Sequence, residues 1–122
     1  MPTPRFNELS SGLVSATLTD ANGDPIAGSD LTALTLTLTD VDTGQIINHR
    51  DVDNILTSPS PVDEVGALTL ALDAEDNVIV TPRRQIERHR ALLQFEWADG
   101  SSYEEIMIEV KNLRTIGSGS PN

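Results

Sequence analysis

The chain has no cysteine among its 122 residues. A disulfide framework, a thiolate zinc site and a cysteine nucleophile are therefore excluded. Aromatic residues are scarce at 3%, with one Trp and one Tyr, so we expect a core of Leu, Ile, Val and Ala. The sequence also lacks a signal-peptide pattern and any apolar run long enough to cross a bilayer. These absences predict a protein that is soluble as made.

Positive charge is also scarce, because eight Lys and Arg stand against nineteen Asp and Glu, for a net charge of −11. Such an excess disfavours binding to nucleic acid and to anionic membranes, so neither is an expected partner. Half of the basic residues lie in one segment, RRQIERHR, as Arg83, Arg84, Arg88 and Arg90. Two interpretations stay open: a solvated loop or short helix, or a docking patch for an acidic neighbour such as a second copy.

Residues 91–110 carry the clearest structural pattern. Ala91, Leu93, Phe95 and Trp97 alternate with polar residues, and after Asp99-Gly100 the alternation resumes through residues 106–110. Strict alternation is typical of a strand with one face on a core, and Asp-Gly suits a tight reversal. This pattern predicts a β-hairpin with Trp97 in the core.

Further alternating runs predict strands at 13–19, 31–39, 45–50, 67–72 and 78–80, with an irregular segment at 51–65. In 31–39 the leucines are expected to face the core and the threonines the solvent. The resulting fold class is all-β, an immunoglobulin-like antiparallel β-sandwich of about seven strands. We expect it to span residues 11–115, with an N-terminal arm at 1–10 and a flexible tail at 116–122.

The N-terminal arm is expected to resist regular pairing because of Pro2 and Pro4. Its large apolar side chains are Phe6 and Leu9. Either the arm is a loose tail, or these two residues anchor it on a neighbouring subunit.

Residues with catalytic potential give no enzyme signature, and neither a cofactor nor a metal site is predicted. The paired carboxylates lie in predicted turns, where solvent keeps them from acid–base work. His49 and His89 have no ligand-spaced partner and are expected to be polar surface residues. The carboxylate pairs are Asp40 with Asp42, Asp51 with Asp53, and Glu75 with Asp76.

Residues 20–24 spell D-x-N-x-D, the opening of a calcium loop. The sixth and twelfth positions are Pro25 and Leu31, where an EF-hand needs Gly and Glu. The segment is therefore expected to be a turn between strands. A loose calcium site that borrows Asp73 or Asp76 from another loop stays open.

Four stretches together carry a family resemblance: ATLTDANGDPIAG, TALTLTLTDVDTGQII, GALTLAL and RALLQFEWADGSSYEEIMIEV. They resemble phage baseplate and tail proteins with immunoglobulin-like domains, in particular the N-terminal domain family of baseplate upper proteins. The shared elements fall at Asp20–Pro25, Leu36–Ile47 and Phe95–Tyr103. The sequence departs from that pattern at 88–90, where Arg-His-Arg replaces the family's Gly-x-Tyr.

The resemblance implies a non-enzymatic structural component of a tailed-phage virion, in the tail, neck or baseplate. Its partners would be other virion proteins in a multi-copy or homo-oligomeric assembly. It would be made in the host cytoplasm without a signal peptide and would end in the virion. The expected contact residues are Phe6, Leu9 and the four arginines of 83–90. The alternatives are a capsid decoration protein, or a carbohydrate- or surface-binding module, which needs Trp97 or Tyr103 exposed.

Overall fold

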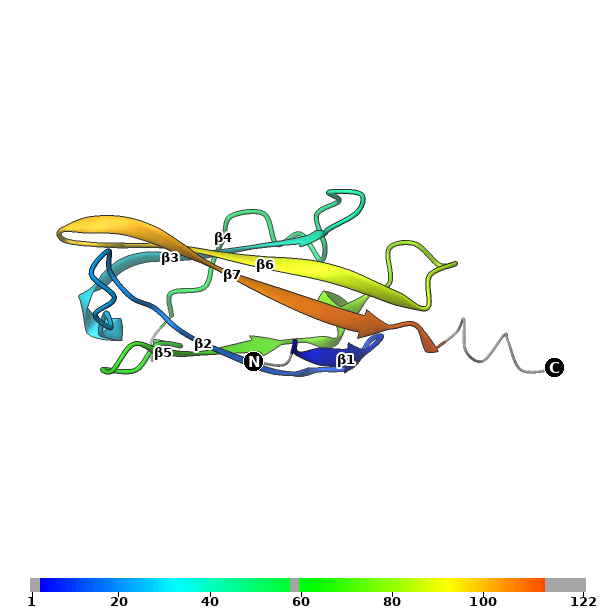
Figure 1. Ribbon diagram of the computed structural model, residues 1–122, viewed down its shortest axis with the longest axis horizontal. Coiled ribbons are helices and arrows are strands. Elements are labelled where there is room, and N and C mark those ends of the chain that lie inside the picture. Colours follow the sequence, from blue (N-terminus) through cyan, green and yellow to red (C-terminus); the bar gives the residue numbers. More distant parts are fainter. Residues whose placement is uncertain (1–2, 58–59, 114–122) are drawn as a thin grey trace.

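The computed structural model describes residues 3–57 and 60–113 of the chain. They form a mostly-β protein of two sheets, and no α-helix occurs within these two ranges (Figure 1). No helix of the described residues is long and apolar enough to cross a membrane. The larger sheet has the order β1 (Arg5–Asn7), β7 (Gly100–Lys111), β6 (Ile86–Trp97), β3 (Leu31–Asp40) and β4 (Asp53–Asn54), and the smaller pairs β2 (Gly12–Thr17) with β5 (Ala67–Leu72).

The hairpin of β6 and β7 is the centre of the larger sheet, as the alternation predicts. The two strands pair without interruption from Ile86 opposite Lys111 to Trp97 opposite Gly100. β6 begins at Ile86, inside the basic segment for which a loop or a short helix was expected. Strand β3 pairs with the other edge of β6, so β6 has a neighbour on both sides over most of its length.

The core lies between the inner faces of the two sheets. Leu34, Leu36 and Leu38 of β3 are fully buried, whereas Thr35 and Thr37 point to the outer face, as predicted. Strands β2 and β5 supply the opposite layer, and buried loop residues close its ends. The further members of the core are Val14, Leu18, Ile26, Leu31, Ile47, Val62, Leu68, Leu70, Leu72, Ala91, Leu93, Phe95, Ile108 and Val110.

The N-terminal segment differs from the expected unpaired arm. Residues 5–7 form β1, which runs parallel to β7, so the larger sheet is mixed and not purely antiparallel. Pro4 does not prevent this pairing, because it contributes only its carbonyl, which accepts a 2.9 Å hydrogen bond from the Glu109 N–H. Phe6 packs against the core and lies over Gly12, where an added Cβ would come within 2.3 Å of its ring.

Two predicted strands are absent from the described residues, at 45–50 and at 78–80. In the first, Asn48 and His49 take positive φ angles of 54° and 57°, and Arg50 N–H donates to the Ile47 carbonyl at 3.0 Å. This tight turn leaves a single bridge, Thr39 to Ile46, before β4 resumes the pairing with β3. The predicted tail at 116–122 lies outside the described residues.

Replacing Leu36 by Ala tests the two-layer core. Leu36 is fully buried between the sheets, so we expect the free energy of unfolding to fall by about 2–5 kcal/mol. Leu13, at 66% exposure, is the matched control, and Leu13→Ala is expected to change it by less than about 0.5 kcal/mol. Urea denaturation measures both, and equal losses would contradict the assigned inner and outer faces.

Candidate functional site

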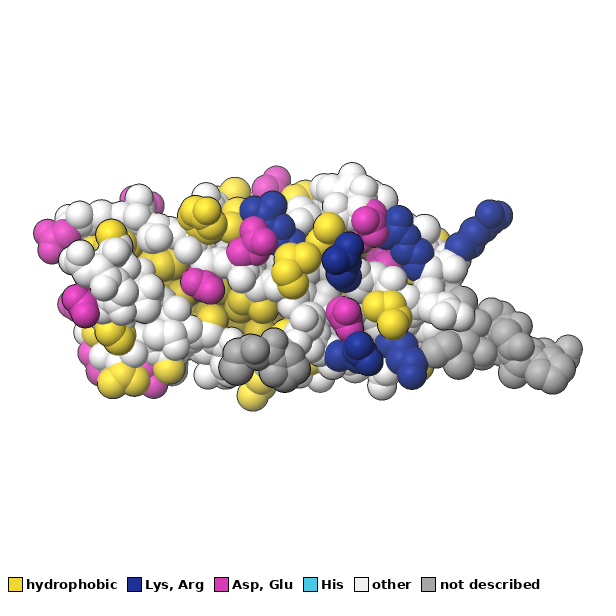
Figure 2. Space-filling model, in the orientation of Figure 1, with side chains coloured by type: hydrophobic (Ala, Val, Ile, Leu, Met, Phe, Trp, Pro, Cys, Tyr) yellow, Lys and Arg dark blue, Asp and Glu magenta, His cyan; other side chains and the backbone are white. Residues whose placement is uncertain are grey.

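Charge is unevenly distributed between the two ends of the molecule. The end that holds the β6–β7 turn carries seven carboxylates and, among the described residues, no Lys or Arg; we call it the acidic end. The described Lys and Arg residues lie from the middle of the molecule to its other end, which we call the arginine end, and the remaining carboxylates lie among them (Figure 2). The acidic end consists of Asp20, Asp24, Asp30, Asp63, Glu64, Glu96 and Asp99.

The predicted basic segment divides into paired and unpaired arginines. Arg84 forms an ion pair with Asp42, and Arg90 forms one with Glu105 of β7. Arg83 and Arg88 are exposed, and no ion pair holds either of them within residues 3–57 and 60–113. The arginine end therefore presents two guanidinium groups that are free to meet an acidic partner.

The other two predicted contact residues lie near this end but in different settings. Phe6 packs against the core of its own chain, whereas Leu9 is 44% exposed. Leu9 and Pro82 line a small recess of about 100 Å³, together with Val78 and Ile79. The arginine end thus combines an apolar recess with the unpaired arginines.

A groove of about 500 Å³ separates β2 from the first part of β7. β1 covers β7 only at residues 109–111, and β2 pairs only with β5, so both strands have open edges beside the groove. Leu13, Ala16 and Ile106 contribute apolar surface to its lining. Figure 2 shows a hollow with hydrophobic side chains in the middle of the face in view. An open edge is able to pair with an incoming strand.

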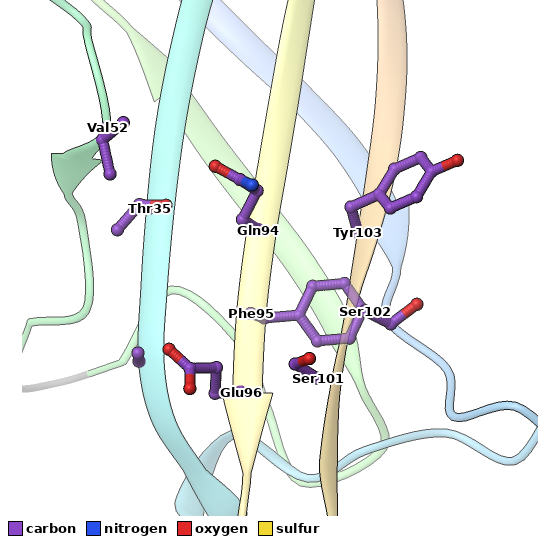
Figure 3. Close-up of a pocket in the computed structure, with 9 residues that line it drawn as sticks. Thr35, Val52, Gln94, Phe95, Glu96, Ser101, Ser102 and Tyr103 are labelled. Carbon is purple, nitrogen blue, oxygen red and sulfur yellow. The ribbon is translucent and has the colours of Figure 1, made fainter.

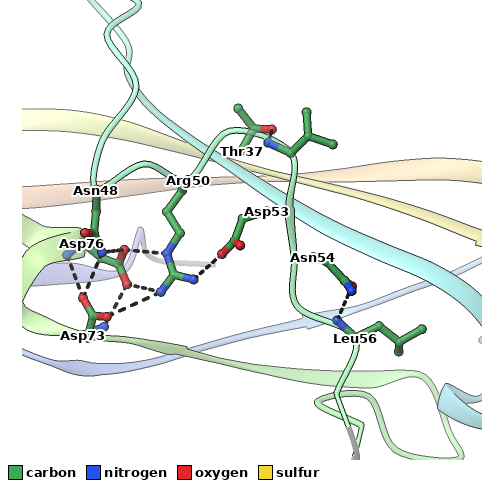
Figure 4. A network of polar contacts seen from close by, with 9 residues as sticks. Thr37, Asn48, Arg50, Asp53, Asn54, Leu56, Asp73 and Asp76 are labelled. Carbon is green, nitrogen blue, oxygen red and sulfur yellow. Dashed lines mark hydrogen bonds and ion pairs between the residues drawn. The ribbon is translucent and has the colours of Figure 1, made fainter.

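A polar network around Arg50 joins the β3–β4 connection to the 3₁₀ turn η2 (Ala74–Asn77), as Figure 4 shows. The guanidinium binds both oxygens of Asp76, each at 2.8 Å, and donates to Asp53 at 2.7 Å. Asn48 adds a 2.9 Å hydrogen bond to Asp76 from the positive-φ turn. Asp73 is the N-cap residue of η2 and forms a reciprocal capping box with Asp76.

The network shifts the pKa values of its central pair in opposite directions. Burial alone raises the pKa of Asp76, but hydrogen bonds from Arg50, Asn48 and the Asp73 backbone outweigh it and lower the pKa below 3.8. The hydrogen bond to Asp76 raises the pKa of Arg50 further above its ordinary value. Asp76 was expected to be a solvated turn carboxylate; it is instead fully buried, and Arg50 compensates its charge.

A second buried polar cluster was missed by the sequence analysis. Glu87, His89 and Asp40 are all fully buried on the inner face of the larger sheet. The prediction that His89 is a surface residue is therefore wrong, as is the prediction that Asp40 is solvated. The sequence does contain a pattern that indicates this burial. If the alternation that buries Ala91 is continued toward the N-terminus, His89 and Glu87 fall on the core face, and Arg88 and Arg90 fall on the outer face. His49, by contrast, is exposed.

The outer face of the larger sheet carries an open recess of about 520 Å³ (Figure 3). Tyr103 is 64% exposed there, beside Gln94, Ser101 and Ser102. Trp97 is partly buried and stacks on Phe95 with ring centroids 5.9 Å apart. Among the described residues that line this recess, Tyr103 is the aromatic side chain with an exposed ring. A sugar-binding platform uses several exposed aromatic rings, and this recess offers one.

The D-x-N-x-D segment forms a closed turn, because Asp20 Oδ1 accepts hydrogen bonds from the Asn22 and Asp24 amides at 2.9 and 3.0 Å. Asp73 and Asp76 lie at the opposite end and bind Arg50 and Asn48. The open possibility of a calcium site shared between these loops is therefore excluded.

No protein-family model and no curated protein matches the chain. A solved structure that does match is the X-ray structure of the endo-beta-1,4-mannanase from Thermotoga petrophila, at 14% identity with a TM-score of 0.43. The match covers 92% of this chain but 18% of the mannanase chain, so this chain spans less than a fifth of that enzyme. A likeness this distant carries no conclusion about function.

Replacing Arg50 by Ala is expected to destabilise the fold by about 3–5 kcal/mol, because the buried Asp76 carboxylate then loses its counter-charge. Arg83→Ala is the matched control: it removes an exposed arginine at the same end and is expected to change stability by less than about 0.5 kcal/mol. Thermal and urea denaturation measure the difference, and equal effects would contradict the bridging role of Arg50.

The lowered pKa of Asp76 also predicts a pH dependence of stability. A carboxyl with a lower pKa in the folded state stabilises the fold fully above its unfolded value of 3.8, and this contribution is lost as pH falls through the folded pKa. We expect Asp76→Asn to flatten the dependence of unfolding free energy on pH below 3.8. Denaturation at a series of pH values measures the slope, and an unchanged slope would contradict the prediction.

Proposed function

We propose that this chain is a non-enzymatic structural component of a tailed-phage virion, acting through protein–protein contacts in a multi-copy assembly. The observation that supports it best is the uneven placement of basic residues: among the described residues the acidic end has seven carboxylates and no Lys or Arg, whereas the arginine end presents Arg83 and Arg88 without an ion pair. Copies that stack acidic end to arginine end would bring these opposite charges together.

The geometry of such a contact is heterologous, because two different surfaces of the same chain meet. A heterologous contact builds either a closed ring or an open filament, and both are multi-copy assemblies. The recess lined by Leu9 and Pro82 adds apolar surface beside the arginines, so that the contact does not rest on screened surface charge alone.

The immunoglobulin-like assignment of the sandwich belongs to this proposal. It is supported by the resemblance of most of residues 12–111 to the baseplate family and by two facing sheets with a shared core. The virion setting rests on that resemblance. Other virion proteins would be the further partners, and the open edges of β2 and β7 would offer them a place for strand pairing.

A non-catalytic role is supported by the state of the polar clusters. The Asp40, Glu87 and His89 side chains are buried from solvent. Both carboxylate oxygens of Asp76 accept hydrogen bonds from Arg50, and one also accepts from Asn48. A catalytic carboxylate or imidazole has to touch its substrate. The exposed carboxylates of the acidic end lie in turns and at the end of β6, where a docking surface is the simpler use.

The proposal predicts self-association that weakens with salt, because the Debye length falls from about 10 Å at 0.1 M to about 3 Å at 1 M ionic strength. Light scattering coupled to size exclusion measures the mass at both ionic strengths. We expect a defined oligomer at low salt and dissociation at high salt. A monomer under all conditions would contradict self-assembly.

A charge-matched pair of variants locates the contact. Arg83→Gln with Arg88→Gln makes the net charge more negative by two and is expected to give a monomer at low salt. Thr69→Glu with Ala71→Glu makes the same charge change on exposed positions of β5, away from both ends, and is expected to leave the oligomer intact. Equal dissociation in both would indicate general repulsion, not an arginine-end interface.

A further inference from the structure

The buried cluster of Asp40, Glu87 and His89 carries an inference that is independent of the proposed assembly role. Asp40 closes β3, and Glu87 and His89 lie near the start of β6, where Asp40 is paired with His89 across the sheet. The three residues have 0% exposure. One donor atom from each lies within 4.8 Å of those of the other two, so the three side chains converge on a common point.

Glu87 is held firmly by neighbouring groups. Its Oε1 accepts hydrogen bonds from the Val80 amide at 2.8 Å and lies 2.9 Å from His89 Nε2, and its Oε2 accepts from the Thr81 amide. An ionised carboxylate only accepts hydrogen bonds, so the His89 contact requires the proton on Nε2. The neutral imidazole then keeps a free lone pair on Nδ1.

Two acceptor atoms of the cluster have no donor. Asp40 Oδ2 accepts from the Thr43 hydroxyl at 2.7 Å and from its amide at 3.2 Å, but Asp40 Oδ1 has no hydrogen-bond partner among the described residues. His89 Nδ1 has none there either. Buried acceptors without a donor are costly, and two carboxylates leave a formal charge of −2 in a sealed site.

We propose that Asp40 and His89 bind one divalent transition-metal ion, with Zn²⁺ as the first candidate, and that Glu87 positions the imidazole. Asp40 Oδ1 and His89 Nδ1 supply the free lone pairs, and Glu87 orients the imidazole through its Nε2–H, as carboxylates do for metal-bound histidines. A divalent ion offsets the formal charge of the two carboxylates.

The donor set selects the class of metal. Ca²⁺ takes oxygen ligands, whereas an imidazole nitrogen with a carboxylate suits zinc and its neighbours. Because zinc binds four ligands, water would complete the coordination that Asp40 and His89 begin. Metal–ligand bonds of about 2.0–2.2 Å bring adjacent ligand atoms to about 3–3.5 Å. One candidate ligand atom from each of Asp40, Glu87 and His89 lies within 4.8 Å of the other two, so the cluster is compact enough to surround one ion.

The role of the ion follows from its place in the fold. Asp40 and His89 sit on adjacent strands at the end of the sheet where the core ceases to be apolar, so the ion fastens the end of β3 to the start of β6. Burial excludes substrate, which makes the site structural. Metal binding is then linked to folding, and the ion enters while the chain folds.

The test uses untagged protein that is unfolded with a chelator and refolded with Zn²⁺ or with EDTA. We expect about one zinc per chain after desalting, and a melting temperature raised by about 10 °C when the ion is at 100 times its dissociation constant. Mn²⁺ and Ca²⁺ serve as comparison ions, and Ca²⁺ is expected to have no effect. Equal melting temperatures with Zn²⁺, Mn²⁺ and EDTA would overturn the proposal and assign the two acceptors to a buried water.

Matched variants separate the cluster from adventitious binding. Asp40→Asn and His89→Gln are expected to lose both the zinc and its stabilising effect. Asp42→Asn and His49→Gln make the same changes at exposed positions and are expected to retain both. Zinc bound equally by all four variants would overturn the proposal. If Asp40→Asn or His89→Gln does not fold, the number of zinc ions bound per wild-type chain tests the proposal instead, and a value near zero would overturn it.

Discussion

The period of two along β6 is the constraint on which the remaining structure depends. Strand β6 pairs with β3 on one side and β7 on the other, so a shift of one residue would invert both faces of the larger sheet. Its inner face holds Ala91, Leu93 and Phe95, which fix the register by burial. The same register forces Glu87 and His89 inward and Arg88 and Arg90 outward. The sealed cluster and the exposed arginines therefore share one origin.

Sequence patterns predicted the parts of the fold that rest on local alternation. The final hairpin, the leucine face of β3 and the whole of β5 agree with expectation because each pattern is long and strictly periodic. The parallel pairing of β1 was not predictable, since it joins residues 5–7 to residues 109–111 without a local signal. The strand predicted at 45–50 is absent because Asn48 and His49 form a positive-φ turn without glycine, which residue propensity does not indicate.

The candidate sites were predicted less well than the fold, for a related physical reason. Charged residues were assigned to solvent by type, yet Asp76 is buried because Arg50 reaches it from a distant loop. Such compensation is a tertiary property. His89 differs, because its burial follows from extending the β6 alternation by one step, whereas residue type alone predicts exposure. The four arginines of 83–90 also divide by tertiary position: Arg90 pairs with Glu105 across two strands, Arg84 pairs with Asp42 between two loops, and Arg83 and Arg88 have no ion pair within the described residues.

The parallel alignment of β1 and β7 has a mechanical consequence. Tension applied between Pro4 at the start of β1 and Lys111 at the end of β7 pulls two adjacent parallel strands in opposite directions along their length. Their hydrogen bonds, such as Glu109 N–H to Pro4 and Glu8 N–H to the Lys111 carbonyl, then bear the load together in shear instead of opening one by one. Phe6, seated over Gly12, must leave the core before the strands slide. The short edge strand is thus a clamp against pulling along the chain.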